Sequence, residues 1–323
     1  MTRDILLIAV GLILLIAGAE LLVRSSVLIA ARLGVSSLLI GLTVVAFGTS
    51  APEIVASVVA ALRGSSGIAV GNIVGSNITN ALLVTGSVAL VAPIAVTGAA
   101  LRRDGVMALV SAAALWFVCA MQKLEIFASV VLLSTLVLYV WFAYRQERMN
   151  AAPGAIKSRG MVHAKPEGAP VPTRPHNVAV LILGAVAGLA LLAGGGQLLV
   201  VSAVNLAVDL GISEAVIGLT IVAIGTSLPE LATSLLAARR GESGIAFGNV
   251  LGSNIFNVLG IGGLTAILSQ GDVPTRIIVF DFPTMLAATG LLLIVAATGR
   301  RIGKVEGGVL VVLFCAYLAS MWV

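Results

Sequence analysis

Ten apolar stretches, each long enough to cross a lipid bilayer, dominate the chain. A membrane-spanning helix needs about 20 predominantly apolar residues. The stretches cover residues 4–31, 37–62, 68–92, 103–121, 125–145, 178–208, 214–238, 245–268, 278–298 and 304–322. Charged residues make up only 10% of the chain, against about 25% in soluble domains, which excludes a soluble enzyme and a disordered protein. The sequence therefore predicts an all-α membrane protein with ten transmembrane helices.

The two halves of the chain carry the same extended motif. Residues 41–86 and 218–263 align without a gap at an offset of 177, and 28 of the 46 positions are identical. Each half contains five of the expected spans, and because five is odd, the second half must enter the membrane from the opposite side. Inverted repeats of this kind are typical of secondary transporters, whose substrate site lies at the repeat interface near mid-membrane.

A polar segment separates the two halves. Residues 146–177 hold five of the ten prolines and show no apolar periodicity, as expected for a linker. We therefore divide the chain into a first five-helix repeat (1–145), a cytoplasmic linker (146–177) and a second, inverted five-helix repeat (178–323). With both termini outside, 14 of the 19 Lys and Arg residues fall on the inner side and 4 on the outer side, which favours this orientation.

Each repeat places the motif G-T-S-x-P-E inside an apolar span, at residues 48–53 and 225–230. Proline removes a backbone donor and kinks or breaks a helix, so nearby carbonyl groups need other partners. The carboxylates of Glu53 and Glu230 fall near mid-span, where an unpaired charge costs about 2.5–3.5 kcal/mol. Both features indicate that a cation compensates for the buried negative charge.

A second polar cluster follows in each repeat, with the pattern G-N-x-x-G-S-N-I-x-N. Helical spacing places Ser76 and Asn80 on one face, and it does the same for Ser253 and Asn257. Hydroxyl, amide and carboxylate oxygens, without His, Cys, Lys or Arg, are the ligands of hard cations such as Ca²⁺. Sodium is similar in size, so one set of oxygens could hold either ion at different times, which is the physical basis of exchange.

Several of these features also have simpler interpretations. A kinked helix with a hydrogen-bonded glutamate, or small residues that only pack two helices, would explain one copy of the motifs, but two intact copies argue against this. Glu20 corresponds to a neutral glutamine in the second repeat, so a buried hydrogen bond or an interfacial position is as good an interpretation as ion access. Asp104 and Asp281 lie near expected helix starts, where capping is the default expectation. Cys119 and Cys315 are expected to be buried apolar residues.

The two duplicated motifs resemble those of the cation/Ca²⁺ exchanger superfamily, in which two α-repeats carry G-T-S-x-P-E and G-S-N-I-x-N. The resemblance covers both repeats, the ten-helix plan and the central linker, which is nearly the whole chain. It implies a sodium/calcium exchanger fold of the prokaryotic type, in which two long sloping helices, here the first and sixth spans, slide against the other eight. It also implies four cation positions at the centre.

The resemblance further implies roles for individual residues. Calcium would be bound by the carboxylates of Glu53 and Glu230 and by the carbonyls of Thr49 and Thr226. One sodium site would use Ala46, Thr49, Ser50, Glu53 and Ser76, the other would use Ala223, Thr226, Ser227, Glu230 and Ser253, and Asn80 and Asn257 would line the middle. Asparagine at position 257 argues against potassium dependence, and asparagine in both clusters favours sodium over protons.

We therefore expect a secondary active antiporter that exchanges Ca²⁺ for Na⁺ by alternating access, with an H⁺/Ca²⁺ exchanger as the alternative. Ca²⁺ and Na⁺ would be transported ions, and no organic cofactor is expected. An intramembrane enzyme would need a nucleophile–base pair or metal-binding His and Cys residues, and a passive channel would conduct without a counter-ion. The expected partners are inorganic cations and the lipid bilayer of a prokaryotic inner membrane, with no nucleic acid and a monomeric assembly.

Overall fold

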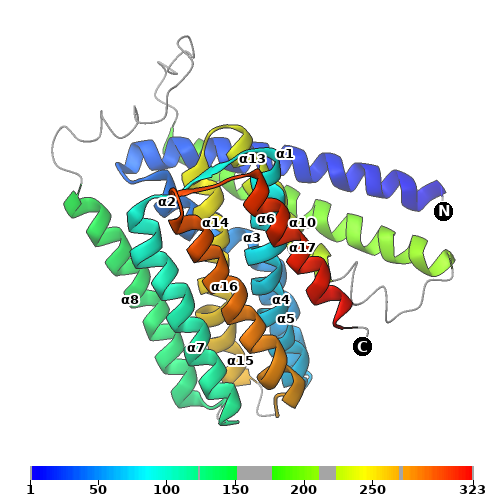
Figure 1. Ribbon diagram of the computed structural model, residues 1–323. Coiled ribbons are helices and arrows are strands. Elements are labelled where there is room, and N and C mark those ends of the chain that lie inside the picture. Colours follow the sequence, from blue (N-terminus) through cyan, green and yellow to red (C-terminus); the bar gives the residue numbers. More distant parts are fainter. Residues whose placement is uncertain (1, 123, 151–176, 211–222, 269–271, 322–323) are drawn as a thin grey trace.

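The computed structural model describes residues 2–122, 124–150, 177–210, 223–268 and 272–321 (Figure 1). Most of the expected linker, with its two histidines, and residues 214–222 of the seventh expected span lie outside these residues. The helices are α1 (Thr2–Leu33), α2 (Ser37–Ile40), α3 (Ala46–Thr49), α4 (Ala51–Leu62), α5 (Ser66–Thr79), α6 (Thr85–Val91), α7 (Val106–Ala120), α8 (Ile126–Asn150), α10 (Val178–Asp209), α12 (Ala223–Gly225), α13 (Leu228–Arg239), α14 (Ser243–Ile255), α15 (Gly262–Leu268), α16 (Phe282–Ala297) and α17 (Lys304–Ala319).

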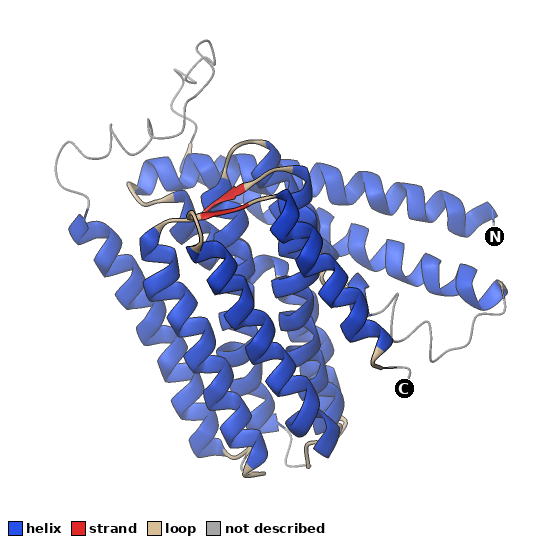
Figure 2. Cartoon of the chain, viewed as in Figure 1, coloured by secondary structure: helices blue, strands red, loops and turns tan. Residues whose placement is uncertain are grey.

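Short π-helical turns join several of these helices without interrupting them. They are η1 (Gly41–Val45), η2 (Asn80–Val84), η3 (Ala100–Gly105), η5 (Phe256–Ile261) and η6 (Ile277–Asp281). One two-residue antiparallel ladder joins β1 (Ile94–Ala95) to β2 (Arg301–Ile302), with Ile94 opposite Ile302 (Figure 2). The sequence did not predict this ladder, which links the end of the α6 segment to the start of α17.

The expected spans agree with the helices in most places. Over the described part of the chain, seven segments are long and apolar enough to cross a membrane: Thr2–Leu33, Ser66–Val91, Ala100–Ala120, Ile126–Met149, Val178–Asp209, Ser243–Leu268 and Ile277–Ala297. Ser37–Thr49 and Ala51–Leu62 form an eighth if a pair bent by 47° counts as one span. Of the other two, the span at 214–238 is described only from residue 223, and α17 has 16 residues, a length of about 24 Å.

Two spans form the centre of the molecule. In the apolar stretches of Ser66–Val91 and Ser243–Leu268, 78% of the residues are buried. In the other five apolar spans the share of buried residues is between 22% and 39%. Helices with most of their surface inside the protein can carry polar side chains that would be costly against lipid. The two asparagine-rich clusters of the sequence belong to these central spans.

The two longest helices, α1 and α10, cross each other at direct backbone contact, and Figure 1 shows them lying across the rest of the bundle. A Cβ atom added to Gly11 would lie 2.8 Å from the carbonyl oxygen of Gly195. One added to Gly188 would lie 2.9 Å from the carbonyl oxygen of Gly18. Small residues allow this close approach between membrane helices, so a larger side chain at the crossing would push the two helices apart.

Proline breaks a helix at the same point in each half of the chain. Helix α3 ends at Thr49, and α4 begins with Pro52 in its first turn. Helix α13 likewise begins with Pro229 in its first turn, after α12. Because proline cannot donate to the preceding turn, each break places a glutamate in the first turn of a new helix, where the helix dipole favours negative charge.

The boundaries of the helices repeat at the same offset as the sequence. Helices α4 (51–62) and α13 (228–239) are related by 177 residues at both ends. Each is followed by a glycine in the left-handed region, Gly64 with φ of +73° and Gly241 with φ of +77°. A residue without a Cβ atom adopts this conformation at no steric cost, so both turns lead into the next helix, α5 or α14, in the same way.

Candidate cation site

Two carboxylates lie inside the protein, near enough to interact electrostatically. Glu53 is in the first turn of α4 and Glu230 is in the first turn of α13, and both are fully buried. Among the residues that the structure describes, neither forms an ion pair with Lys, Arg or His. Two buried like charges without a cationic partner repel each other and lose their hydration, so the fully charged pair is disfavoured unless a cation or a proton neutralises it.

Hydroxyl groups from both halves of the chain surround Glu230. Ser50 donates a hydrogen bond of 3.1 Å to Oε1 of Glu230, and Ser253 donates one of 3.4 Å to the same atom. The second oxygen, Oε2, has no hydrogen-bond partner in the described chain. One oxygen of this carboxylate is therefore fixed in direction, while the other is free to act as a ligand.

Glu53 has a different environment from Glu230, although the two motifs are identical in sequence. Neither of its carboxylate oxygens forms a hydrogen bond with a described residue. The side chains of Thr226 and Ser227 lie beside it, but the hydroxyl of Ser227 also has no partner in hydrogen-bonding geometry. The two carboxylates thus differ in this conformation, because Glu230 accepts hydrogen bonds from described residues and Glu53 accepts none.

Asparagine side chains hold the main chain of both glutamates. Asn72 donates to the hydroxyl of Ser57 at 2.8 Å and to the carbonyl oxygen of Glu53 at 3.3 Å. Asn249 makes the equivalent bonds, to Ser234 at 3.0 Å and to the carbonyl oxygen of Glu230 at 3.4 Å. These four residues were not among the predicted ligands. The sequence signal that could have identified them is that they occupy equivalent positions in the two repeated segments.

The two halves meet through a second pair of asparagines. Asn77 donates 3.1 Å to the carbonyl oxygen of Asn254, and Asn254 donates 3.4 Å to the carbonyl oxygen of Asn77. Asn257 donates to the hydroxyl of Ser76 at 3.1 Å and to Oδ1 of Asn77 at 3.2 Å. The structure brings three of the predicted site residues together where α5 meets α14 and η5: Ser76 in α5, Ser253 in α14 and Asn257 in η5.

The predicted first-repeat residues bind partners in the second repeat. Thr49 donates to Oδ1 of Asn249 at 3.0 Å, and Ser253 lies 3.5 Å from the carbonyl oxygen of Ala46. Ala223 begins α12 and Thr226 lies in the turn before α13. These two contacts run between the copies, whereas the resemblance grouped each predicted sodium site within one copy.

Several oxygen and nitrogen atoms at this centre have no hydrogen-bond partner among the described residues. They are both carboxylate oxygens of Glu53, Oε2 of Glu230, Oγ of Ser227, Oδ1 and Nδ2 of Asn80, and Oδ1 of Asn254 and Asn257. A buried polar atom left unpaired costs about 1–3 kcal/mol. The turns that begin at or next to these asparagines pack against the opposite glutamate helices, η2 against α13 and η5 against α4. This arrangement provides a set of unpaired oxygens suited to a hard cation.

The donor set excludes the softer metals. Across the described ranges, no group of three or more His, Cys, Asp and Glu side chains lies close enough to hold a metal ion. Zinc and copper sites use imidazole and thiolate ligands. The centre therefore offers two carboxylates supplemented by hydroxyl and amide oxygens, which matches the ligand preference of Ca²⁺ and Na⁺.

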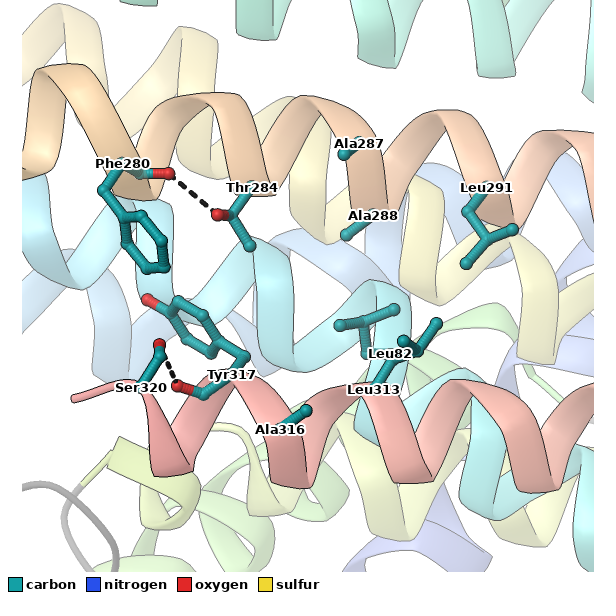
Figure 3. A pocket seen from close by; sticks show the side chains of 10 residues that line it. All are labelled: Leu82, Phe280, Thr284, Ala287, Ala288, Leu291, Leu313, Ala316, Tyr317 and Ser320. Carbon is teal, nitrogen blue, oxygen red and sulfur yellow. Dashed lines mark hydrogen bonds between the residues drawn. The ribbon is translucent and has the colours of Figure 1, made fainter. Parts of the chain in front are cut away.

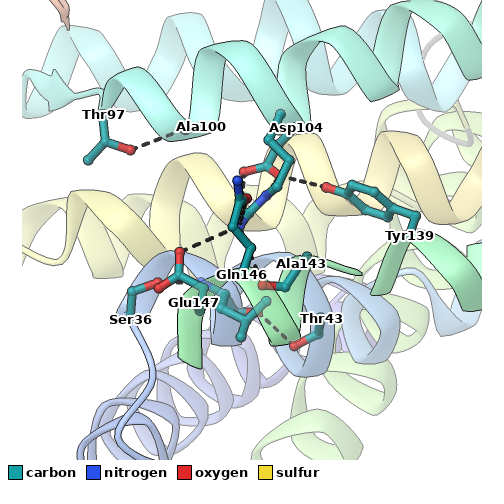
Figure 4. Close-up of polar contacts among 11 residues, drawn as sticks. Ser36, Thr43, Thr97, Ala100, Asp104, Tyr139, Ala143, Gln146 and Glu147 are labelled. Atoms are coloured by element: carbon teal, nitrogen blue, oxygen red, sulfur yellow. Dashed lines mark hydrogen bonds and ion pairs between the residues drawn. The ribbon is translucent and has the colours of Figure 1, made fainter. Parts of the chain in front are cut away.

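The expectation that Asp104 and Asp281 cap helices is wrong. Neither forms a side-chain cap bond, because α7 begins after Gly105 and Asp281 bonds elsewhere. Instead Tyr139 donates 2.8 Å to Asp104 (Figure 4) and Tyr317 donates 3.1 Å to Asp281. The helix start is shifted by the π-helical turns η3 and η6, which carry each aspartate into the protein and towards a tyrosine on the last helix of its half.

Two other residues have clear environments. Glu20 pairs with Arg240 at the end of α13, and both side chains are about 40% exposed, so Glu20 is a partly exposed paired residue. Cys119 is buried and Cys315 is exposed, and both are free thiols. The expectation of a buried position is thus confirmed for Cys119 and wrong for Cys315, because α17 lies at the periphery of the bundle.

Known proteins are similar in sequence and fold to this chain. A family model described as sodium/calcium exchanger protein matches residues 4–145 and 180–323. The chain is 39% identical over 333 residues to a putative antiporter of Alkalimonas amylolytica, covering 96% of both chains. It is 34% identical over 347 residues to a sodium/calcium exchanger of Methanosarcina acetivorans, covering 99% of both chains. The structure is similar to that of the sodium-calcium exchanger NCX_Mj, with a TM-score of 0.81, 30% identity and 98% of both chains covered.

Proposed function

Because the chain belongs to the sodium/calcium exchanger family, and is therefore an integral membrane cation/Ca²⁺ antiporter and not an enzyme, we propose that it exchanges Ca²⁺ for Na⁺. The observation that carries this proposal is the pair of fully buried carboxylates, Glu53 and Glu230, with no cationic side chain paired to them in the described structure. A single divalent cation neutralises two carboxylates, and so do two monovalent cations. The same pair therefore serves either ion, but not both fully at once.

We assign the transported ions to the same residues as the resemblance does. Calcium is bound by the carboxylates of Glu53 and Glu230 with the carbonyl groups of Thr49 and Thr226. The flanking sodium sites use Ala46, Ser50, Ser76, Ala223, Ser227 and Ser253, with Asn80 and Asn257 at the middle. The unpaired oxygens of Glu53, Asn80 and Asn257 support this assignment, since a bound cation would satisfy them.

The transport cycle uses ten spans in two inverted repeats of five helices. Residues 1–145 and 178–323 form the repeats, and residues 146–177 connect them on the cytoplasmic side. Helices α1 and α10 rock against the remaining helices and expose the fixed site to each membrane face in turn. The glycine contacts between α1 and α10 support this movement as a unit, because they hold the two backbones directly against each other.

The protein works in the prokaryotic inner membrane, with both termini outside, and functions as a monomer. The distribution of Lys and Arg over the two sides of the expected spans supports this orientation. Calcium leaves the cell while sodium enters down its gradient. If the charge of the entering sodium exceeds that of the departing calcium, transport is electrogenic.

The coupling ion is tested in liposomes that contain the purified full-length chain and radioactive calcium. An outward-directed or inward-directed sodium gradient is imposed in one set, and a pH gradient at equal sodium concentration in another. The proposal predicts calcium flux in the direction opposite to the sodium flux, reversing when the sodium gradient is reversed. Flux that follows only the pH gradient would assign the protein to H⁺/Ca²⁺ exchange, and flux without any counter-ion gradient would indicate a channel.

A further inference from the structure

A groove opens on the periphery of the bundle between α16 and α17 (Figure 3). It has a volume of about 300 Å³ and is lined by Leu82, Phe280, Thr284, Ala287, Ala288, Leu291, Leu313, Ala316, Tyr317 and Ser320. Helix α17 packs closely on α6, where a Cβ atom added to Gly86 would lie 2.7 Å from the carbonyl oxygen of Gly307. Helices α16 and α17 both contact η2, and the small side chains between them leave the groove open.

The groove has an apolar interior and faces the surroundings of the bundle. Phe280 and Leu313 on its rim are 42% and 39% exposed, whereas Leu82 and Ala288 on its floor are buried. Helix α16 belongs to an apolar span, so the exposed rim of the groove lies within the hydrocarbon layer. An apolar groove in that position favours a lipid chain over water.

The length of the groove corresponds to one leaflet of a bilayer. Phe280, in the turn η6, and Leu291, in α16, lie at its two ends. Leu291 lies eleven residues after Phe280, which corresponds to about 16 Å at 1.5 Å per residue. The hydrocarbon core of a bilayer is about 30 Å thick, so one leaflet contributes about 15 Å. The groove therefore accommodates one acyl chain from the membrane surface to the midplane.

A positive charge lies at the surface end of the groove. The guanidinium group of Arg276 donates a 3.3 Å hydrogen bond to the carbonyl oxygen of Ser320 and lies 5.9 Å from the ring centre of Phe280. Both of these residues line the groove. Arg276 is exposed, and although the carboxylate of Asp281 is near enough to interact with it electrostatically, no ion pair joins Arg276 to a described acidic residue. Its charge is placed to contact a lipid phosphate while the acyl chain enters the groove.

We propose that the groove between α16 and α17 is a phospholipid site, in which Arg276 contacts the phosphate and one acyl chain lies against Leu82 and Ala288. Leu82 belongs to the π-helical turn η2, which begins at Asn80. An acyl chain in the groove thus packs against the groove-facing side of η2, the turn that carries the proposed ion ligand Asn80. The lipid site stands on the groove and Arg276 alone, whereas its effect on transport rests on the proposed function.

Lipid binding is measured by native mass spectrometry of the purified chain after exchange into phosphatidylglycerol or phosphatidylcholine. Phenylalanine at Ala316 or Ala287 fills the groove from its exposed rim, and we expect each variant to lose the retained phosphatidylglycerol. Arg276→Gln should lower the preference for phosphatidylglycerol over phosphatidylcholine about fivefold, the effect of one basic residue near a membrane surface. Ala319→Phe is the matched control, because Ala319 is exposed on α17 but does not line the groove.

A photoreactive acyl chain on phosphatidylglycerol locates the bound lipid independently of any variant. The proposal predicts crosslinks to residues of α16, α17 and η2 in the wild-type chain. Crosslinks elsewhere, or groove-filling variants that retain lipid as the wild type does, would overturn the site. Normal lipid binding combined with absent calcium transport would leave the lipid site intact and contradict only the proposed function.

Discussion

Asn77 and Asn254 occupy equivalent positions of the two repeated segments, yet the structure predicts unequal effects when each is replaced by alanine. Asn77→Ala removes two side-chain hydrogen bonds, the 3.1 Å bond to the carbonyl oxygen of Asn254 and the 3.2 Å bond from Asn257. Asn254→Ala removes one bond of 3.4 Å, and Oδ1 of Asn254 has no partner to lose among the described residues. The volume removed is the same in both variants, so the cost of the cavity largely cancels in the comparison.

The difference can be estimated from the number of bonds. Side-chain hydrogen bonds between membrane helices contribute about 0.6 kcal/mol on average and up to about 1.7 kcal/mol. Losing two bonds therefore costs about 1–3 kcal/mol, whereas losing one long bond costs about 0.5 kcal/mol. A difference near 1 kcal/mol corresponds to a Tm lower by roughly 2–4 °C for Asn77→Ala than for Asn254→Ala.

Thermal unfolding in detergent can be followed by the reaction of a thiol dye with Cys119. This side chain is fully buried, so it reacts only after unfolding, and Cys315→Ser removes the exposed thiol from the background. The measurement is made without calcium, because ligand binding would shift the midpoint independently. Equal midpoints for the two variants, or a lower midpoint for Asn254→Ala, would refute the assigned hydrogen-bond pattern.

Three further substitutions test other parts of the structure. Gly18→Leu should abolish calcium flux, and a folded variant with full flux would contradict the close crossing, because a Cβ atom there lies 2.8 Å from the carbonyl oxygen of Gly188. Tyr139→Phe should lower stability by about 1–3 kcal/mol in the same dye assay, since it removes the hydroxyl bonded to the buried Asp104; an unchanged Tm would contradict this role. Glu20→Gln should keep most of the calcium flux and change stability by no more than about 1 kcal/mol, because this carboxylate is partly exposed and pairs with an arginine; complete loss of flux would place it in the ion path.

The parts of the fold that depend on local sequence could be predicted. Apolar length identified most of the spans, and the duplicated motif located the two helix breaks, because proline acts on its own backbone wherever it occurs. The burial of Glu53 and Glu230 followed from the same pattern, since a charge within an apolar span has to lie inside the protein. The exposure of Cys315 did not follow, because an apolar residue in a membrane helix can face either protein or lipid.

The contacts between distant segments could not be predicted in this way. Identical motifs gave no reason to expect that Ser50 would bind Glu230, or that Glu53 would lack hydrogen bonds in the described chain. Asp104 in η3 and Asp281 in η6 were expected to cap helices because a π-helical turn, which shifts the register by one residue, has no recognised sequence signal. Asn72 shows the same limit, since its role in holding the main chain of Glu53 depends on how α5 packs against α4.

Sodium-driven calcium flux in carboxylate variants tests the central claim most directly. Wild-type chain, Glu53→Gln, Glu230→Gln and the control Glu125→Gln, which changes an exposed glutamate, are reconstituted into liposomes at equal density. If the buried pair holds the transported ions, each single substitution at positions 53 and 230 abolishes flux, because one remaining carboxylate cannot neutralise Ca²⁺, while the control transports normally. Calcium flux at the wild-type rate in either Glu53→Gln or Glu230→Gln would contradict the assignment of the site.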